Sequence, residues 1–332
     1  MQITLQKSKI AKQSSVKITG SKSESNRLLL LQALYPEIEL ENISNSDDSV
    51  LMAKALKTSA KTVDIHHAGT AMRFLTAYFS IQEAHEVTLT GSKRMQERPI
   101  KILVDALKTL GAEISYVNQE GFPPVNIKGQ KLTQQQVTLK ANVSSQYISA
   151  LLLIASKLDN GLELFLEGEI TSIPYIKMTL SLLQDLGIET SFVNNTINVK
   201  PKITNTEPKI ITVESDWSSA SYYFSLVALS EIDTEITLSS YKEKSLQGDS
   251  CLVDIYKHFG VHTTFKAHSI TLKKVQTTLK PLKLDLKNAP DIAQTIAVTC
   301  FALGLPCDLK GLHTLKIKET DRLVALKTEI EK

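Results

Sequence analysis

Short runs of small and polar residues that lead into apolar segments are the feature of this sequence most suggestive of chemistry. Five occur: GSKSESNR from Gly20, AGTAMR from Ala68, SSQYIS from Ser144, SSASYY from Ser218 and APDIAQ from Ala289. Serine, threonine and aspartate before an apolar run are helix N-cap signals, and the free N–H groups at a helix start attract anions. Any one run is explained by capping alone, whereas five together predict a set of anion-binding turns.

Fixed cations accompany several of these turns. They are Lys22 and Arg27 at the first, Arg73 at the second, and Lys93, Arg94 and Arg98 in the segment GSKRMQERPI. A further cluster, KIKETDRL, places Lys318 and Arg322 four residues apart, on one face of a helix start, with Glu319 beside Lys318. A charge run of this kind by itself is typical of a solvated surface. Together with the turns, it favours binding of anionic small molecules.

Motifs for cofactors are missing from the sequence. A nucleotide phosphate loop requires G-x-x-x-x-G-K-[ST], and Ser21 stands where the second glycine should precede Lys22. No G-x-G-x-x-G follows a predicted strand, and His66 and His67 are adjacent rather than four residues apart. We therefore expect no organic cofactor and no metal.

The elements that must position these residues form a repeat. Amphipathic runs end at Gly111, Gly187 and Gly260, and these glycines and the polar helix starts recur at intervals of about 75 residues. Glycine just past a helix caps it, because glycine adopts the left-handed conformation without strain. An earlier unit has Ala60 in the glycine's place, so we expect a helix end there too. Alternating residues at 86–90, 136–140, 196–200 and 269–273 predict half-buried strands.

Each unit is therefore expected to run strand, helix, strand, helix, strand, strand. The last predicted helix, at 321–332, ends the sequence about two residues before its capping glycine is due. From this phase we expect the chain to be truncated, with the last unit missing.

Length and composition set the class of protein. A chain of 332 residues, 42% hydrophobic with a net charge of +3, is expected to fold as two globular domains. Three scattered cysteines indicate a reducing compartment, and the longest apolar run is too short to span a bilayer. No secretory signal is present, and the small net charge does not favour general nucleic-acid binding. We expect a cytoplasmic monomer whose partners are neither nucleic acid nor membrane.

Nine motifs in order resemble the 5-enolpyruvylshikimate-3-phosphate synthase family, also called 3-phosphoshikimate 1-carboxyvinyltransferase. They are GSKSESNR, AGTAMR, GSKRMQERPI, SSQYISALL, SIPYIKMTL, SDWSSASYYF, QGD, APDIAQTIA and KETDRL, and they run from about residue 19 to the last residue. The resemblance implies an α/β (α+β) protein, a two-domain inverse α/β barrel of βαβαββ units. Residues 19–213 would form the first domain, with three units on the shikimate 3-phosphate side, and residues 1–18 with 214–332 an incomplete second domain.

The activity implied by the resemblance is transfer of the enolpyruvyl group of phosphoenolpyruvate to the 5-hydroxyl of shikimate 3-phosphate. Phosphate leaves after a tetrahedral intermediate, in a cleft that closes between the domains, without metal or organic cofactor. The reaction belongs to the shikimate pathway, which supplies chorismate and the aromatic amino acids.

The same resemblance implies roles for individual residues. The shikimate 3-phosphate side comprises Ser23, Arg27, Ser144, Ser145, Ser172, Tyr175, Asp291 and Lys318. The phosphoenolpyruvate side comprises Lys22, Gly69, Arg94, Gln146 and Arg322. The catalytic set comprises Asp291, Lys318, Glu319 and Lys22, with the division of acid and base roles left open. Asp216 matches a position at the domain junction, where an N-cap and a substrate contact are equally compatible with the sequence.

The sequence departs from the family pattern at several positions and leaves two rival functions open. His67 stands in place of Asn or Asp, Thr19 in place of Pro, and a final Arg and Lys for the phosphoenolpyruvate phosphate are missing. One rival is a UDP-amino-sugar enolpyruvyl transferase, which uses a loop cysteine as acid, whereas all three cysteines here lie at residue 251 or beyond. The other is a truncated form that binds substrate with little catalysis.

Overall fold

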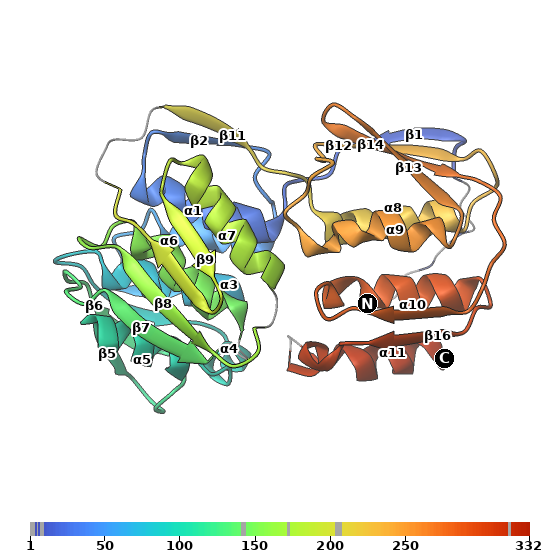
Figure 1. Ribbon diagram of the computed structural model, residues 1–332. Coiled ribbons are helices and arrows are strands. Elements are labelled where there is room, and N and C mark those ends of the chain that lie inside the picture. Colours follow the sequence, from blue (N-terminus) through green and yellow to red (C-terminus); the bar gives the residue numbers. More distant parts are fainter. Residues whose placement is uncertain are drawn as a thin grey trace. The chain divides into compact units, whose positions relative to one another are not determined.

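The computed structural model describes residues 4, 6, 10–140, 144–170, 173–202, 208–317 and 320–332 (Figure 1). The chain divides into two compact units: a first domain, Thr19–Val213, and a second domain, Met1–Ile18 with Glu214–Lys332. Both are mixed α/β structures. No helix in the described part of the chain is long and apolar enough to cross a membrane.

The first domain contains two complete copies of the predicted repeat. One consists of β3 (Thr62–Asp64), α3 (Gly69–Ser80), β4 (Glu86–Thr90), a short α4 (Lys93–Gln96), α5 (Lys101–Leu110), β5 (Glu113–Tyr116) and β6 (Val125–Lys128). The next consists of β7 (Gln136–Lys140), α6 (Ser145–Ala155), β8 (Leu162–Glu167), α7 (Ile173–Asp185), β9 (Thr190–Val193) and β10 (Thr196–Val199). Their sheets have the same order, β3-β4-β6-β5 and β7-β8-β10-β9, with the first pair parallel and the others antiparallel. The predicted βαβαββ repeat is confirmed.

The second domain contains a third copy and part of another. Its elements are β1 (Gln13–Val16), α8 (Trp217–Ala228), β12 (Glu235–Ser239), the 3-10 turn Gly248–Cys251, α9 (Leu252–Lys257), β13 (Val261–Lys266) and β14 (Ser269–Lys274). They are followed by β15 (Leu282–Asp285), the 3-10 turn Pro290–Ile292, α10 (Ala293–Ala302), β16 (Cys307–Lys310), the 3-10 turn His313–Ile317 and α11 (Arg322–Ile330). The complete sheet has the order β1-β12-β14-β13, and β15 pairs in parallel with β16.

Two strands complete sheets that lie far from them in sequence. The first domain opens with α1 (Lys22–Leu34), β2 (Ile38–Glu41) and α2 (Asp47–Ala55), and β11 (Lys209–Thr212) pairs in parallel with β2. Strand β1 pairs in parallel with β12, as β3 does with β4 and β7 with β8. Strands β1 and β11 thus supply the leading strand of a repeat whose remaining elements lie elsewhere in the chain.

Left-handed glycines end the helices where the sequence predicts them. Gly111 caps α5 with a φ of 109°, and Gly187 and Gly260 follow α7 and α9 with a φ of 74° each. The expectation for Ala60 was wrong, because α2 already ends at Ala55. An alanine does not adopt the left-handed conformation cheaply, and the Ala60 N–H instead donates to the Thr58 hydroxyl in a local turn.

The cores differ between the domains. In the first domain, every residue of α3 is buried, as is every residue of α6 except Gln146, which is typical of central helices. The second domain packs around Trp217, Phe224 and Tyr256. Helix α11 buries none of its residues, and α8 and α10 leave Tyr222 and Phe301 largely exposed.

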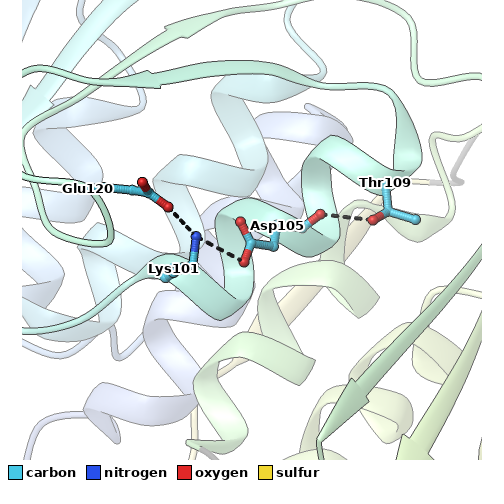
Figure 2. Close-up of polar contacts among 4 residues, drawn as sticks. All are labelled: Lys101, Asp105, Thr109 and Glu120. Carbon is cyan, nitrogen blue, oxygen red and sulfur yellow. Dashed lines mark hydrogen bonds and ion pairs between the residues drawn. The ribbon is translucent and has the colours of Figure 1, made fainter.

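Ion pairs at the start of α5 illustrate the surface chemistry (Figure 2). Lys101 contacts both Asp105 and Glu120, and the Thr109 hydroxyl donates to the Asp105 carbonyl at 3.0 Å. The charged groups are at least half exposed, so solvent screens them and they contribute little to stability. This cluster therefore offers a control position for experiments on the candidate site.

Candidate active site

The guanidinium of Arg27 is the centre of a polar cluster in the first domain. Its Nε donates to the Thr179 hydroxyl at 2.7 Å, and its Nη2 donates to the Ser149 hydroxyl at 2.9 Å. Its other acceptors are the carbonyls of Ser23, at 2.7 Å from Nη1, and of Tyr175, at 3.4 Å from Nη2. The first two turns of α1, α6 and α7 supply all these groups, so the three helix starts converge on one cation.

Arg27 is a buried cation, and removal from water disfavours its charged form. Desolvation lowers the pKa of Arg27 to about 10, against opposing effects of Tyr175 and Glu24. The rings of Phe74 and Tyr175 lie 5.4 and 5.9 Å from its central carbon, within the range of cation–π attraction. The acceptors in its hydrogen bonds are all neutral oxygens, which orient the charge without neutralising it. A ligand carboxylate would be attracted to such a group.

A second polar cluster joins the starts of α3 and α6. Gln146 donates from its side-chain amide to the Thr70 hydroxyl at 3.2 Å. The buried Arg73 guanidinium donates to the Gly69 and Pro99 carbonyls at 3.1 and 3.2 Å, and burial lowers its pKa. The Tyr147 hydroxyl also donates to the Pro99 carbonyl, at 2.7 Å. The segment after α4 is therefore held against both helix starts.

Gly69 lies directly beneath a cation. A Cβ atom built at this position would stand 2.6 Å from Nη1 and 2.9 Å from Nη2 of Arg98. The absence of a side chain thus allows the Arg98 guanidinium to lie across the first residue of α3. The N–H of the next residue, Thr70, donates to the Asp48 carboxylate at 3.3 Å. This arrangement places a cation at a helix start, beside the backbone of Gly69.

Other residues of the first domain that the resemblance singles out lie at helix starts. Lys22 and Ser145 are the first residues of α1 and α6, with Lys22 exposed and Ser145 buried. Ser144 is the N-cap of α6 and accepts from the Gln146 N–H at 3.3 Å. Arg94 is exposed and paired with Glu97 at 3.1 Å, so the structure joins it to neither cluster.

In the second domain, the structure pairs two residues to which the resemblance gives different roles. Arg322, the first residue of α11, donates from Nη1 to the Asp291 carboxylate at 2.9 Å. Asp216 is the N-cap of α8 and accepts from the Ser219 N–H at 2.7 Å, so the structure supports the capping alternative. Ser172, Lys318 and Glu319 lie outside the described residues.

Sequence reasoning missed the hydroxyls that hold Arg27. Ser149 and Thr179 lie within the motifs SSQYISALL and SIPYIKMTL, but neither was given a role, because each is a small polar residue inside a mostly apolar helix. The available signal was their position: each lies on the second turn of a helix whose start had been singled out. A serine or threonine in the middle of a buried helix needs a partner, and here that partner is a cation.

The fold is that of the enolpyruvyl transferases. The chain matches a solved EPSP synthase from Acinetobacter baumannii with a TM-score of 0.78 at 20% identity, over 97% of this chain and 78% of that chain. It also matches the enolpyruvyl transferase NikO from Streptomyces tendae with a TM-score of 0.63 at 14% identity, over 89% and 73% of the two chains. At these identities, the likeness shows the fold alone.

Sequence comparison gives the family. The family model of EPSP synthase (3-phosphoshikimate 1-carboxyvinyltransferase) matches residues 57–332. A 3-phosphoshikimate 1-carboxyvinyltransferase of Bacteroides fragilis is 48% identical over 320 residues, which cover 96% of this chain and 77% of that protein. One of Pasteurella multocida is 35% identical over 350 residues, covering 96% and 78%. The chain belongs to the EPSP synthase family, and the resemblance inferred from the nine motifs is confirmed.

Proposed function

We propose that this protein transfers the enolpyruvyl group of phosphoenolpyruvate to the 5-hydroxyl of shikimate 3-phosphate and releases phosphate. Membership of the family and the 48% identity to the Bacteroides fragilis relative support the reaction. In the cell this is a step of the shikimate pathway. The proposal includes a cytoplasmic, monomeric enzyme whose partners are small anions and which requires no cofactor.

The observation that carries the proposal is the buried guanidinium of Arg27. Its four hydrogen bonds go to neutral oxygens and can occupy four of its five N–H donors, so among the described residues one donor on Nη1 is left for a ligand. A carboxylate there would accept a hydrogen bond from this donor in a low-dielectric site, where the attraction is strong. Shikimate 3-phosphate carries such a carboxylate.

The remaining helix starts of the first domain fit the other anionic groups. In this proposal, Ser23 and Tyr175 contact the shikimate ring and carboxylate, and Ser144, Ser145 and Ser172 hold its phosphate. The phosphoenolpyruvate side comprises Lys22, Gly69, Arg94, Gln146 and Arg322. Hydroxyl and N–H donors suit a phosphate of roughly −1.5 to −2 charge, and the cations balance it.

The chemistry then needs two proton movements in the addition step. The 5-hydroxyl loses its proton as its oxygen bonds to C2 of phosphoenolpyruvate, and the methylene carbon gains a proton. Loss of a proton from the resulting methyl group expels phosphate and restores the double bond. Asp291, Lys318, Glu319 and Lys22 are the proposed proton-transfer and electrostatic groups. Among them, Asp291 is held by an ion pair with Arg322 at 2.9 Å, which fixes the position of its carboxylate.

Phosphate release on mixing the two substrates tests the proposal. We expect release only when both shikimate 3-phosphate and phosphoenolpyruvate are present, with enolpyruvyl-shikimate 3-phosphate as the co-product. Calorimetry with shikimate 3-phosphate alone separates binding from turnover. Binding without turnover would favour the binding-only alternative, and neither binding nor turnover would contradict the proposal.

A further inference from the structure

We propose that Thr179 and Ser149 are positioning residues that fix the plane of the Arg27 guanidinium for the substrate carboxylate. This inference rests on the proposed function, since it concerns how the same site recognises shikimate 3-phosphate. Neither residue stands at a helix start. Their role would be exerted through Arg27 rather than through contact with the substrate.

The geometry defines the orientation of the guanidinium from two sides. Thr179 Oγ1 lies 2.7 Å from Nε, and Ser149 Oγ lies 2.9 Å from Nη2. The two hydroxyls also bond to each other, at 3.0 Å, so they form one connected edge along the guanidinium. Thr179 and Ser149 are fully buried, and Arg27 is 2% exposed, so water is not available to replace either acceptor.

Hydroxyl groups suit this task better than carboxylates would. A carboxylate beside Nε and Nη2 would hold the guanidinium in the same plane, but its negative charge would compete with that of the ligand. A hydroxyl accepts the hydrogen bond while leaving the net charge of Arg27 in place. The pair therefore orients the cation and preserves its attraction for an incoming anion.

The second domain contains the same hydroxyl pair without a cation. Thr299 on α10 donates to Ser225 on α8 at 2.8 Å and lies 2.8 Å from the carbonyl of Thr295, four residues earlier. Thr179 likewise lies 2.9 Å from the carbonyl of Tyr175, four residues earlier. The third partner in the second domain is the hydroxyl of Tyr256, at 2.9 Å. The pair is thus a recurring feature of helix packing, and in the first domain it holds a guanidinium.

This internal copy supplies a matched control. Thr179→Val and Thr299→Val each remove one buried hydroxyl and keep the side-chain volume. We expect Thr179→Val to weaken shikimate 3-phosphate binding about tenfold, equivalent to about 1.4 kcal/mol, with phosphoenolpyruvate KM little changed. Thr299→Val should bind shikimate 3-phosphate as the unmodified protein does, and Thr179→Ser, which keeps the hydroxyl, should restore affinity to within about twofold.

A double-mutant cycle with Arg27→Ala tests whether the effect passes through the guanidinium. In the Arg27→Ala background, Thr179→Val should cause no further loss of affinity, because there is no group left to orient. If Thr179→Val does not fold by circular dichroism, Ser149→Ala removes only the Nη2 acceptor and should show a smaller loss in the same direction.

The outcomes separate this inference from the proposed function. Failure of the unmodified protein to bind shikimate 3-phosphate in calorimetry would overturn the proposed function. Normal binding by the unmodified protein together with equal affinity in folded Thr179→Val and Ser149→Ala would overturn the positioning role alone. An equal loss in Thr179→Val and Thr299→Val would also overturn it, since the effect would then be one of general stability.

Discussion

A buried guanidinium needs hydrogen-bond acceptors for its N–H groups and a fixed orientation toward its ligand. Arg27 is held by four neutral oxygens and two aromatic rings, and burial lowers its pKa to about 10. It remains protonated at neutral pH because that value lies well above 7. The residue is therefore a cation at neutral pH whose geometry is set by the protein and whose remaining Nη1 donor can bind the ligand.

Replacing Arg27 by lysine tests how much of the affinity for shikimate 3-phosphate depends on the shape of the guanidinium rather than on its charge. Arg27→Lys keeps the charge, but an ammonium on one nitrogen cannot reproduce the bonds to Thr179, Ser149 and Ser23 together. We expect shikimate 3-phosphate affinity to fall at least tenfold, or about 1.4 kcal/mol, by calorimetry. Lys101→Ala, at the exposed ion pairs of Figure 2, is the control and should bind normally. Unchanged affinity in Arg27→Lys would show that charge alone suffices.

The absence of a side chain at Gly69 gives a second prediction. In Gly69→Ala, the new Cβ would stand 2.6 Å from Arg98 Nη1, so the guanidinium must move away. We expect the KM for phosphoenolpyruvate to rise severalfold while shikimate 3-phosphate affinity stays the same. Steady-state kinetics with each substrate varied in turn checks this. A rise confined to the shikimate 3-phosphate KM would place the two substrates differently from the present proposal.

At the scale of single residues, whether the sequence could predict a contact depended on how far apart the two residues lie along the chain. Arg27 was identified from its place beside a helix start, because neighbours in sequence are neighbours on a helix. Its hydroxyl partners lie 122 and 152 residues away, and the Asp291–Arg322 pair is separated by 31 residues. Such contacts depend on how helices from different repeats pack, which no local pattern encodes.

At the scale of elements, the repeat could be predicted because particular residue types mark the ends of its helices and strands. Glycines in the left-handed conformation end α5, α7 and α9, and strands β4 and β7 match the predicted ranges at both ends. The predicted helix end at Ala60 was wrong for a related reason. Alanine stands there in place of the capping glycine, so α2 is not capped at that point and ends earlier. The sharing of β1 and β11 between distant repeats left no local signal, so the motif resemblance alone implied where β1 belongs.

Two of these glycines predict different costs of substitution. In Gly187→Ala, the new Cβ meets only Lys202 Nζ at 3.9 Å, so the cost is left-handed strain of roughly 1–2 kcal/mol. In Gly260→Ala, the Cβ would also stand 2.5 Å from the Val275 carbonyl oxygen, so we expect a larger loss. Denaturant unfolding followed by circular dichroism measures both. Equal losses of unfolding free energy would mean that the loop after Gly260 moves away from the new Cβ at no cost in stability.

At the scale of the whole molecule, apolar side chains remain on the surface of the second domain. Tyr222 on α8, Phe301 on α10 and Val324 on α11 are 66%, 62% and 60% exposed. Scattered apolar residues are common on protein surfaces, but exposed aromatic side chains on helices promote association at high concentration.

A charge-bearing double variant tests that expectation. Tyr222→Lys with Phe301→Glu should lower the fluorescence of a dye that binds apolar surface and raise the concentration at which light scattering detects association. The free energy of unfolding should change by less than about 0.5 kcal/mol, because the side chains are exposed. Dye fluorescence equal to that of the unmodified protein would show that these residues do not form the dye-binding surface.

The placement of β1 fixes an order of events during synthesis. Strand β1 ends at Val16, whereas its parallel partner β12 begins at Glu235, so the whole first domain is translated between them. That domain receives its own late strand, β11, by Thr212 and can then close its small β11-β2 sheet. Strand β1 thus remains without its parallel partner until the more than 200 residues between Val16 and Glu235 have been made.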